Sequence, residues 1–347
     1  MTRLRALVLT AGRGARLRPL TDTIPKPLLP IAGEPIAAHT LSCLARVGCE
    51  ATAMNLHHLG DQVRQRFGSS CEGMALEYSE ETELLGTLGA LYPLRDFLAE
   101  AEAVVVINGD SYCPWPLKWM IRKHLASGAA ATLLLATGPN ADRYGGGVAI
   151  DRQGRILGFR GAGAERGEVA RRHVFAGAQI LSPRVLRHVP EGPGDTVGDL
   201  YMPMVERGSF LLGLPTRRRW HDLGTPRRYL NGVLDFARGR WPGRLLRRSW
   251  VSPRAAAERG SRLRGVCLEA DSAAERGAVL ERVLLLPGAK VPSGSHLRDT
   301  IVGPQAVLPA NSRLEGRLVT LAREGVPPAA GDSRVGDLLY TPFDPAS

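Results

Sequence analysis

The chain has 347 residues with an apolar content of 44%, which suffices for two domains with a sizeable core and argues against disorder. Its formal net charge of +11 would suit nucleic acid, but only four of the cations are lysines and the arginines are spread along the chain. This distribution predicts solvated faces, or attraction to anionic substrates such as nucleotides, and no nucleic-acid partner. The five cysteines form no CxxC pair, and the sequence shows neither a signal-peptide cleavage site nor a run of membrane-spanning length. We therefore expect a reduced, cytoplasmic protein without a membrane partner.

Residues 9–30, LTAGRGARLRPLTDTIPKPLLP, combine closely spaced glycines with long cations. Gly12 and Gly14 permit a tight turn whose backbone N–H groups face an anion. Arg16 offers a planar fork suited to phosphate oxygens, and Lys26 lies between two prolines that stiffen its loop. The stretch is therefore a candidate phosphate-binding loop, although two glycines alone are weak evidence.

Over the first 240 residues, strand-like apolar runs alternate with helix-like segments. The predicted strands are 4–9, 51–56, 75–79, 103–107 and 132–136, and the predicted helices are 35–47, 60–67, 89–100 and 117–126. This alternation favours an α/β sheet with helices on both faces, in which ligands bind beyond the carboxyl ends of the strands. Both the opening stretch and Asn108-Gly109-Asp110 follow predicted strands directly, so we expect them to face one site.

From Trp241 onward the sequence repeats every 17 residues. Apolar residues recur at the sixth, eleventh and last places, with the sixth occupied by Leu246, Leu263, Leu280, Leu297 and Leu314. Gaps of 5, 6 and 6 residues describe a triangular prism in which each coil must stack on the next. We predict a first domain over residues 1–238, followed in the chain by a left-handed parallel β-helix over residues 241–325. The remaining residues, 326–347, would form a tail that packs over the last coil or is loose.

Four motifs in the first domain resemble those of the sugar-1-phosphate nucleotidylyltransferases, and they occur in the order found in that family. They are the opening AGxGxRLxPLT with PKPLLP (residues 11–21 and 25–30), the base-binding loop LGTLGA (85–90), the metal-binding Asn-Gly-Asp (108–110) and the closing WxDxGTPxxY (220–229). The resemblance spans roughly residues 4–236. It implies a Rossmann-like, GT-A-like domain with a mixed sheet that transfers a nucleotidyl group from an NTP to a sugar 1-phosphate and releases pyrophosphate.

The same resemblance assigns roles to individual residues. It implies nucleotide contacts from Ala11, Gly12, Gly14, Gly86, Thr87 and Asn108, catalytic cations at Arg16 and Lys26, a shared Mg²⁺ at Asp110 and Asp222, and sugar contacts at Gly147 and Gly177. Two carboxylates plus substrate phosphates form the sparse ligand set that Mg²⁺ favours. Taken singly, Asn-Gly-Asp is also good turn chemistry and Asp222 could cap a helix beginning near Thr225. Their occurrence together with the opening loop favours metal ligands, and the family pattern selects Arg16 over Arg18 as the phosphate contact.

Two places leave the interpretation open. The Glu-Lys pair that binds the sugar in the family is missing, and Arg160 either substitutes as a cation or the contact is lost. His57 and His58 follow a strand, but they have no acidic or cysteine partner spaced nearby, which favours a structural or base-side role over a metal site.

The catalytic part most resembles bacterial mannose-1-phosphate guanylyltransferases, and the appended coils favour that group, with GTP as the donor in polysaccharide biosynthesis. A uridylyltransferase, or an enzyme for N-acetylmuramate 1-phosphate or heptose 1-phosphate, is the alternative. A bifunctional acyltransferase would need a catalytic histidine in the coils, where His296 is expected to point outward. Assembly into a homo-oligomer or regulation suits the coils better, and a non-catalytic nucleotide-sugar sensor is the remaining possibility.

Overall fold

The computed structural model describes residues 2–159, 167–237, 244–246 and 249–344, with the backbone alone for 244–246. These residues form two compact units. The first unit consists of Met1–Arg13, Pro25–Pro27 and Ala37–Trp220, and the second of Gly14–Ile24, Leu28–Ile36 and His221–Ser347. The opening glycine- and proline-rich stretch therefore contributes to both units.

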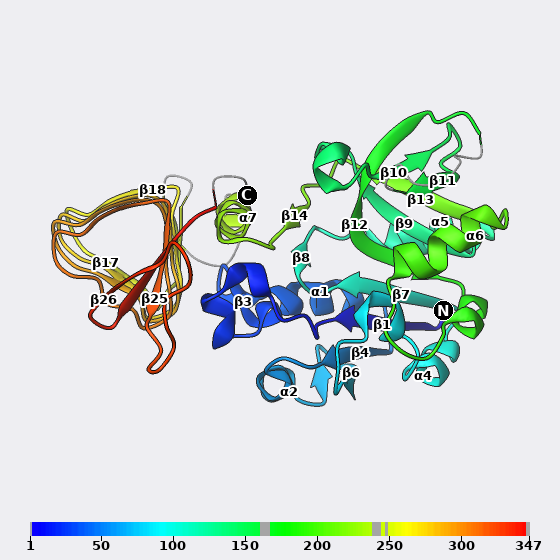
Figure 1. Cartoon of the computed structure of the whole chain (residues 1–347), viewed down its shortest axis with the longest axis horizontal. Coiled ribbons are helices and arrows are strands. Elements are labelled where there is room, and N and C mark those ends of the chain that lie inside the picture. Colours follow the sequence, from blue (N-terminus) through cyan, green and yellow to red (C-terminus); the bar gives the residue numbers. More distant parts are fainter. Residues whose placement is uncertain (1, 160–166, 238–243, 247–248, 345–347) are drawn as a thin grey trace. The chain divides into compact units, whose positions relative to one another are not determined.

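A mixed sheet forms the centre of the first unit (Figure 1). The strands of this unit are β1 (Leu4–Leu9), β4 (Ala51–Leu56), β5 (Ser70–Cys71), β6 (Met74–Glu80), β7 (Ala103–Asn108), β8 (Ser111–Tyr112), β9 (Ala131–Ala136), β10 (Val148–Ile150), β11 (Ile156–Phe159), β12 (Arg171–Leu181) and β13 (Leu211–Thr216). The sheet order is β11-β10-β12-β7-β1-β4-β6-β5, and β13 joins β12 through β9. β1 pairs in parallel with β4 and β7, whereas β12 runs antiparallel to β7. The predicted mixed α/β sheet is confirmed.

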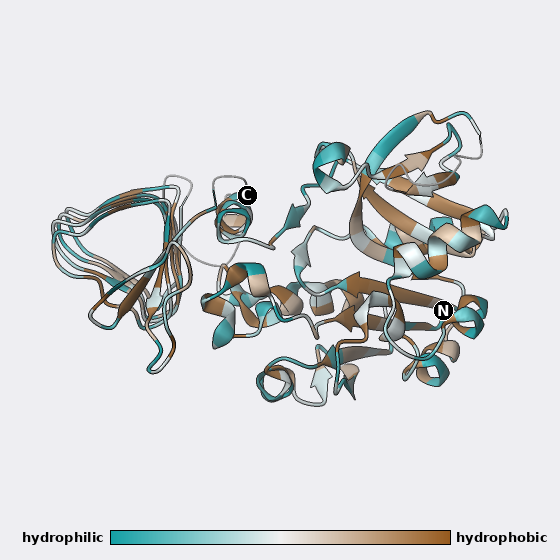
Figure 2. Ribbon diagram, in the orientation of Figure 1, coloured by the Kyte–Doolittle hydropathy of each residue, from teal (hydrophilic) through white to brown (hydrophobic). Residues whose placement is uncertain are grey.

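The central strands are buried along nearly their whole length. All six residues of β4 and of β9 are buried, as are the first five of β7. Strands covered on both faces are buried continuously in this way, and Figure 2 shows much of the ribbon of β7 and β9 as hydrophobic. Most side chains inside the sheet are therefore apolar core, although Thr52, Thr132 and Gln179 are buried polar residues within it.

Helices cover the sheet, with one departure from the sequence expectation. They are α1 (Ile36–Ala45), α2 (Gly60–Phe67), α3 (Gly86–Gly89), α4 (Arg95–Ala99), α5 (Leu117–Ser127) and α6 (Met202–Glu206), with short helical turns η3 (Lys26–Leu28), η4 (Ala141–Tyr144), η5 (Pro183–His188) and η6 (Thr196–Tyr201). The single helix predicted over 89–100 is wrong, because the chain forms α3 and α4 with turns between them. Pro93 lies in that gap, and proline disfavours helical conformation in the residue before it and cannot donate a helical hydrogen bond.

In the second unit, stacked coils of parallel strands follow the helix α7 (Pro226–Ala237). The strands of this unit are β2 (Pro30–Ile31), β3 (Glu34–Pro35), β14 (His221–Asp222), β15 (Arg244–Leu246), β16 (Ser249–Val251), β17 (Ala256–Ala257), β18 (Arg262–Arg264), β19 (Cys267–Leu268), β20 (Ala273–Ala274), β21 (Val279–Leu285), β22 (Lys290–Val291), β23 (His296–Val302), β24 (Arg313–Glu315), β25 (Arg317–Leu321), β26 (Ser333–Val335) and β27 (Leu338–Pro342), preceded by the turns η1 (Ala15–Leu17) and η2 (Leu20–Asp22). Residues 17 positions apart lie side by side on three faces, as in the pairs Ala256↔Ala273, Leu263↔Leu280 and Leu268↔Leu285. The region is a parallel β-helix, and its coils overlie one another in Figure 1.

In the third and fourth coils, the sixth, eleventh and last places of the repeat fill the interior. Leu280, Leu285 and Val291 show this arrangement within one coil, and all three are fully buried. The tenth place points the other way, yet it is also buried and apolar, at Trp250, Cys267, Leu284, Ile301 and Leu318. α7 packs against the strands β16, β19, β21 and β23 that carry this outer column. One outer side of the prism is therefore a second buried interface.

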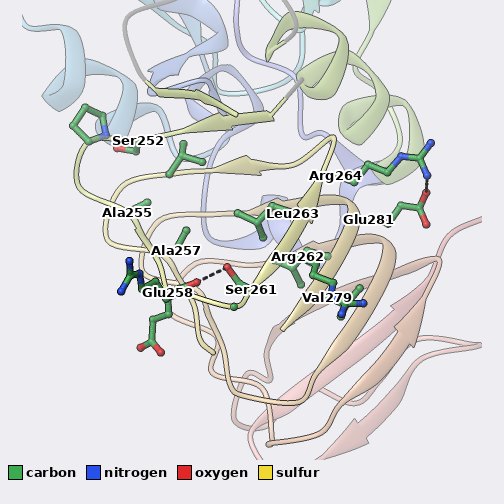
Figure 3. Close-up of a pocket in the computed structure, with 15 residues that line it drawn as sticks. Ser252, Ala255, Ala257, Glu258, Ser261, Arg262, Leu263, Arg264, Val279 and Glu281 are labelled. Carbon is green, nitrogen blue, oxygen red and sulfur yellow. Dashed lines mark hydrogen bonds and ion pairs between the residues drawn. The ribbon is translucent and has the colours of Figure 1, made fainter. Parts of the chain in front are cut away.

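The two ends of the coils differ. After the last coil, β27 runs antiparallel to β25 and pairs with β26, so part of the residues predicted as a tail forms a hairpin on the coil edge. At the first coil a cavity of about 950 Å³ is lined by residues of β17, β18 and β21 and the loops between them (Figure 3). Its rim carries the ion pair between Arg264 and Glu281, at 3.3 Å.

Candidate active site

The carboxyl ends of β1 and β7 meet at one edge of the sheet. Leu9 is the register partner of Asn108, and the Gly109 N–H donates to the Leu9 carbonyl oxygen at 2.9 Å. A methyl group added to Gly109 would lie 2.7 Å from that same oxygen, so only glycine fits. Gly12, three residues beyond the end of β1, has open space where a side chain would stand. The structure thus brings the first glycine loop and the Asn-Gly-Asp turn to the same edge, as predicted.

Lys26 and Asp110 form an ion pair at this edge. Lys26 Nζ lies 2.9 Å from Asp110 Oδ2, with the lysine side chain 6% exposed and the aspartate side chain 44% exposed. The hydroxyl of Ser111 donates to the other oxygen, Oδ1, at 3.2 Å. A cation held in a dry position beside an accessible carboxylate can act on a bound phosphate, because its charge is poorly screened there.

A buried polar network, which the sequence did not suggest, joins the glycine loop to the base-binding loop. The Thr10 N–H donates to Asn55 Oδ1 at 2.7 Å, and Asn55 Nδ2 donates to Glu81 Oε1 at 2.7 Å. Glu81 Oε2 accepts the Leu85 N–H at 3.0 Å. Asn55 and Glu81 are 3% and 6% exposed, and they lie near the end of β4 and just after β6. The only signal in the sequence was an asparagine inside an otherwise apolar run.

The base-binding loop is fixed by glycine geometry and by one hydroxyl. Gly86 has φ +72°, and a methyl group there would lie 2.5 Å from the carbonyl oxygen of Gly194. The Thr87 hydroxyl lies 3.2 Å from Asp195 Oδ1 and accepts the Thr196 N–H at 2.9 Å. The structure therefore places Thr87 as an anchor of the loop, in addition to any contact it makes with a nucleotide.

On the predicted sugar side, Gly177 and Asn108 lie together. A methyl group on Gly177, whose φ is +81°, would stand 2.8 Å from Asn108 Nδ2. Gly147 has φ +69° and packs against the carbonyl oxygen of His173, where a methyl group would lie 2.6 Å away. Both glycines therefore make close backbone approaches that larger residues would prevent. Arg160, the proposed substitute cation, lies outside the described residues.

In the second unit, Arg16 and Asp222 come together at Gly224. A methyl group on Gly224 would lie 2.7 Å from Asp222 Oδ1 and 2.8 Å from Arg16 Nη2. Asp222 Oδ2 also accepts a hydrogen bond from Arg228 Nη1 at 2.6 Å, a partner that the motif did not reveal. Two cations thus surround one carboxylate of the closing motif.

The structure also shows the contacts of Arg18 and the residue that caps α7. Arg18 forms an ion pair with Asp22 at 3.0 Å, whereas the guanidinium of Arg16 lies near Gly224, and Arg16 as the phosphate contact stays a prediction. The cap of α7 is Thr225 and not Asp222, because the Thr225 hydroxyl accepts the Arg228 N–H at 3.3 Å.

His57, which follows β4, makes a contact with the backbone. His57 Nδ1 lies 2.9 Å from the carbonyl oxygen of Glu81, which is a structural contact. Among the described residues, no group of three or more His, Cys, Asp or Glu side chains is arranged to hold a metal ion. Across the same residues, no helix is both long and apolar enough to cross a membrane.

Glycine loops and a lysine–carboxylate pair at the carboxyl edge of a mixed sheet define a class of enzymes that act on phosphate-bearing ligands. The family model described as nucleotidyl transferase matches residues 5–238. A mannose-1-phosphate guanyltransferase beta-B of Xenopus laevis is 30% identical over 249 residues, which cover 70% of this chain and 68% of the relative. A probable mannose-1-phosphate guanylyltransferase 2 of Arabidopsis thaliana is 30% identical over 253 residues, with the same two coverages. The chain belongs to the nucleotidyl transferase family, and the predicted resemblance is confirmed.

Solved structures give the same fold. HddC from Yersinia pseudotuberculosis aligns with 68% of this chain and 100% of its own at a TM-score of 0.56 and 24% identity, and a second structure shows that protein complexed with GMP-PN. The protein is a sugar-1-phosphate nucleotidyltransferase.

Proposed function

We propose that the protein is a Mg²⁺-dependent mannose-1-phosphate guanylyltransferase. In this reaction, a phosphate oxygen of mannose 1-phosphate attacks the α-phosphorus of GTP, and the bond from that phosphorus to the β-phosphate oxygen breaks. GDP-mannose and pyrophosphate leave. The step needs no protein nucleophile, because positioning and charge neutralisation supply the acceleration.

The ion pair of Lys26 with Asp110 is the observation that carries the proposal. The side chain of a buried, paired lysine has little conformational freedom. We propose that its charge is therefore held in place where negative charge develops on the α-phosphate. Gly12 leaves backbone access for the triphosphate, and Arg16 offers a guanidinium fork to its oxygens. The relatives named as mannose-1-phosphate guanylyltransferases support the choice of GTP and mannose.

Asp110 and Asp222 are the residues proposed to hold the magnesium ion. Their carboxylates are hard oxygen donors, and Asp110 keeps 44% of its side chain accessible beside a fixed lysine. Both fit a metal that takes few protein ligands and completes its shell with phosphates and water. When bound, such an ion neutralises phosphate charge and polarises the α-phosphate.

A matrix of nucleoside triphosphates against sugar 1-phosphates, read as pyrophosphate release with Mg²⁺, tests the substrate assignment. We expect GTP with mannose 1-phosphate to give the highest kcat/KM. Comparable turnover with UTP and an N-acetylated sugar, and none with GTP, would move the assignment to the uridylyltransferases. Turnover with heptose 1-phosphate alone would move it to the heptose enzymes.

The coils give no support to a second, acyltransferase activity. His296 stands exposed on an outer face, as predicted, beside Arg298 and Arg313. We propose that the coils serve assembly or control of the nucleotidyl transfer.

A further inference from the structure

A buried carboxylate on the coils contacts the continuation of the PKPLLP segment. Glu269, just after β19, is 1% exposed and accepts the Gly33 N–H at Oε2, at 2.9 Å. Cys267 donates weakly to Oε1, with 3.5 Å between sulfur and oxygen. The acceptor and the amide are 236 positions apart in the sequence, so this contact is a tertiary one that the coil repeat does not require.

Gly33, whose N–H donates to Glu269, lies at the tip of a small hairpin. β2 and β3 pair antiparallel, with Pro30 opposite Pro35 and Ile31 opposite Glu34. Gly33 at the tip has φ +93°, and a methyl group there would meet the Trp250 ring at 3.3 Å. The tip is thus held by a carboxylate on one coil and by an indole on the preceding coil.

The base of the hairpin is also held. The Tyr229 hydroxyl, on α7, donates to the carbonyl oxygen of Pro30 at 2.6 Å, and Tyr229 is fully buried. The Ile36 N–H closes the hairpin on the Leu29 carbonyl oxygen at 3.0 Å. The hairpin is therefore held at Pro30 by α7 and at its tip, Gly33, by the first two coils.

The segment leads directly to Lys26. Lys26 and Leu28 share the helical turn η3, and the prolines on either side of Lys26 restrict its backbone. Pro27 and Pro30 fix two of the φ torsions between Lys26 and the hairpin, and Leu28 belongs to the turn η3, so we expect a displacement of the hairpin to pass along the chain to the lysine.

We propose that Glu269 is a positioning residue for nucleotidyl transfer, which fixes the β2–β3 hairpin through the Gly33 amide and thereby sets the place of Lys26. The proposal rests on the proposed role of Lys26 in the reaction. It assigns the second coil of the β-helix a part in catalysis.

Stability alone does not account for a carboxylate at this place. Burial raises the pKa of Glu269 to about 7, although the N–H groups of Gly33 and Ala32 and the thiol of Cys267 favour the ionised form. One coil later the equivalent place is occupied by Leu286, which is fully buried. A leucine would therefore suit the coil at position 269, and the glutamate is retained at a cost to folding.

Glu269→Leu is the key variant, because it removes the acceptor while placing in the coil a side chain that the coil already accepts. We expect an unchanged or raised Tm, kcat lowered by about 10- to 100-fold, and KM for the nucleotide changed by less than about threefold. Glu269→Gln keeps an oxygen for the Gly33 N–H and should restore kcat to within about threefold of the native value. Hydrogen exchange over residues 28–36 should rise in Glu269→Leu and not in Glu269→Gln.

Leu285→Ala supplies the matched control, since Leu285 lies in the interior of the coils and its loss lowers stability without touching the hairpin. It should lower Tm and leave kcat unchanged. In a Lys26→Met background, Glu269→Leu should have no further effect on kcat, because both changes act through one group.

Three results would overturn the proposal: a folded Glu269→Leu variant with kcat within twofold of native, an unchanged exchange rate over 28–36, or an equal loss of kcat in Leu285→Ala. Failure of the proposed function would look different. The native protein would then be inactive with every substrate pair, while the exchange measurement would still report whether Glu269 holds the hairpin.

Discussion

Single side chains decide the chemistry at the edge of the sheet. Asp110 is held from one side by a buried lysine and from the other by a serine hydroxyl, so its orientation is fixed before any ligand arrives. Preorganised charge of this kind lowers a barrier because no reorganisation is needed during the reaction.

Asp110→Asn should therefore lower kcat by about 10²- to 10³-fold while the fold persists. The amide has nearly the same shape but loses the charge that pairs with Lys26 and the donor strength that a magnesium ion needs. Pyrophosphate release gives the rate, and circular dichroism gives the fold. A rate equal to that of the native enzyme would remove Asp110 from the site.

Substitution by alanine at two loop glycines should affect different quantities, stability at Gly86 and the KM for GTP at Gly12. Gly86→Ala places a methyl group 2.5 Å from the Gly194 carbonyl oxygen at φ +72°, which should destabilise the protein by roughly 2–4 kcal/mol. Gly12→Ala meets nothing within 4 Å, so Tm should hold while KM for GTP rises about tenfold, because the methyl group occupies space meant for phosphate. Equal Tm values, or an unchanged KM in Gly12→Ala, would contradict this division.

At the scale of elements, polar residues at strand ends connect the loops. Thr10, Asn55, Glu81 and Leu85 form one buried chain of hydrogen bonds that ties the glycine loop to the base-binding loop. In a dry interior each member depends on the others, because an unpaired donor there is costly.

Glu81→Gln tests that chain. Both oxygens of Glu81 accept N–H groups, and an amide can accept on one side only, so one donor must remain unpaired. We expect a loss of about 1–3 kcal/mol in stability and a larger change in KM for GTP than in kcat. Urea unfolding and steady-state kinetics measure both, and unchanged stability would show that the network is replaceable.

The buried carboxyl of Glu269 gives the coils a pH dependence of defined sign. Burial raises its pKa from 4.5 to about 7, so between these values the folded state binds more protons than the unfolded state. Stability should accordingly fall by roughly 3 kcal/mol as pH rises from about 4.5 to about 7, and the effect should level off above that. The titratable groups that act on it are Cys267, Glu34 and Tyr229.

The comparison of native protein with Glu269→Gln isolates this contribution. The difference in unfolding free energy between the two should change across that pH window, because the native protein loses stability relative to Glu269→Gln as pH rises. Parallel profiles from pH 4 to pH 8 would mean that Glu269 does not titrate in the folded protein over this range.

Across the whole molecule, the sequence was informative where the pattern was local or periodic. The 17-residue repeat predicted the register of the coils, and the strand-then-glycine order placed the Asn-Gly-Asp turn beside the opening loop. Prediction failed where a residue's partner is remote. Glu269 occupies an outward place in the repeat, yet it is 1% exposed and accepts the N–H of Gly33 from the β2–β3 hairpin.

Some of these remote contacts did leave a trace. The tenth place of the repeat is apolar in all five coils, which indicates a covered outer face, although nothing in the repeat says which segment covers it. Asn55 left only a weak trace, a polar residue in an apolar run, because its partner Glu81 lies 26 positions further along the chain. Arg228 left none, because the motif does not show that its guanidinium turns back to Asp222.

The central claim is that this chain joins a sugar phosphate to a nucleotide by displacement of pyrophosphate. ³¹P nuclear magnetic resonance of GTP, mannose 1-phosphate, Mg²⁺ and the native enzyme tests it directly. We predict that pyrophosphate and the diphosphate of a sugar nucleotide appear in equal amounts as the mannose 1-phosphate signal declines. Conversion of GTP to GDP and inorganic phosphate, with mannose 1-phosphate left intact, would contradict the account.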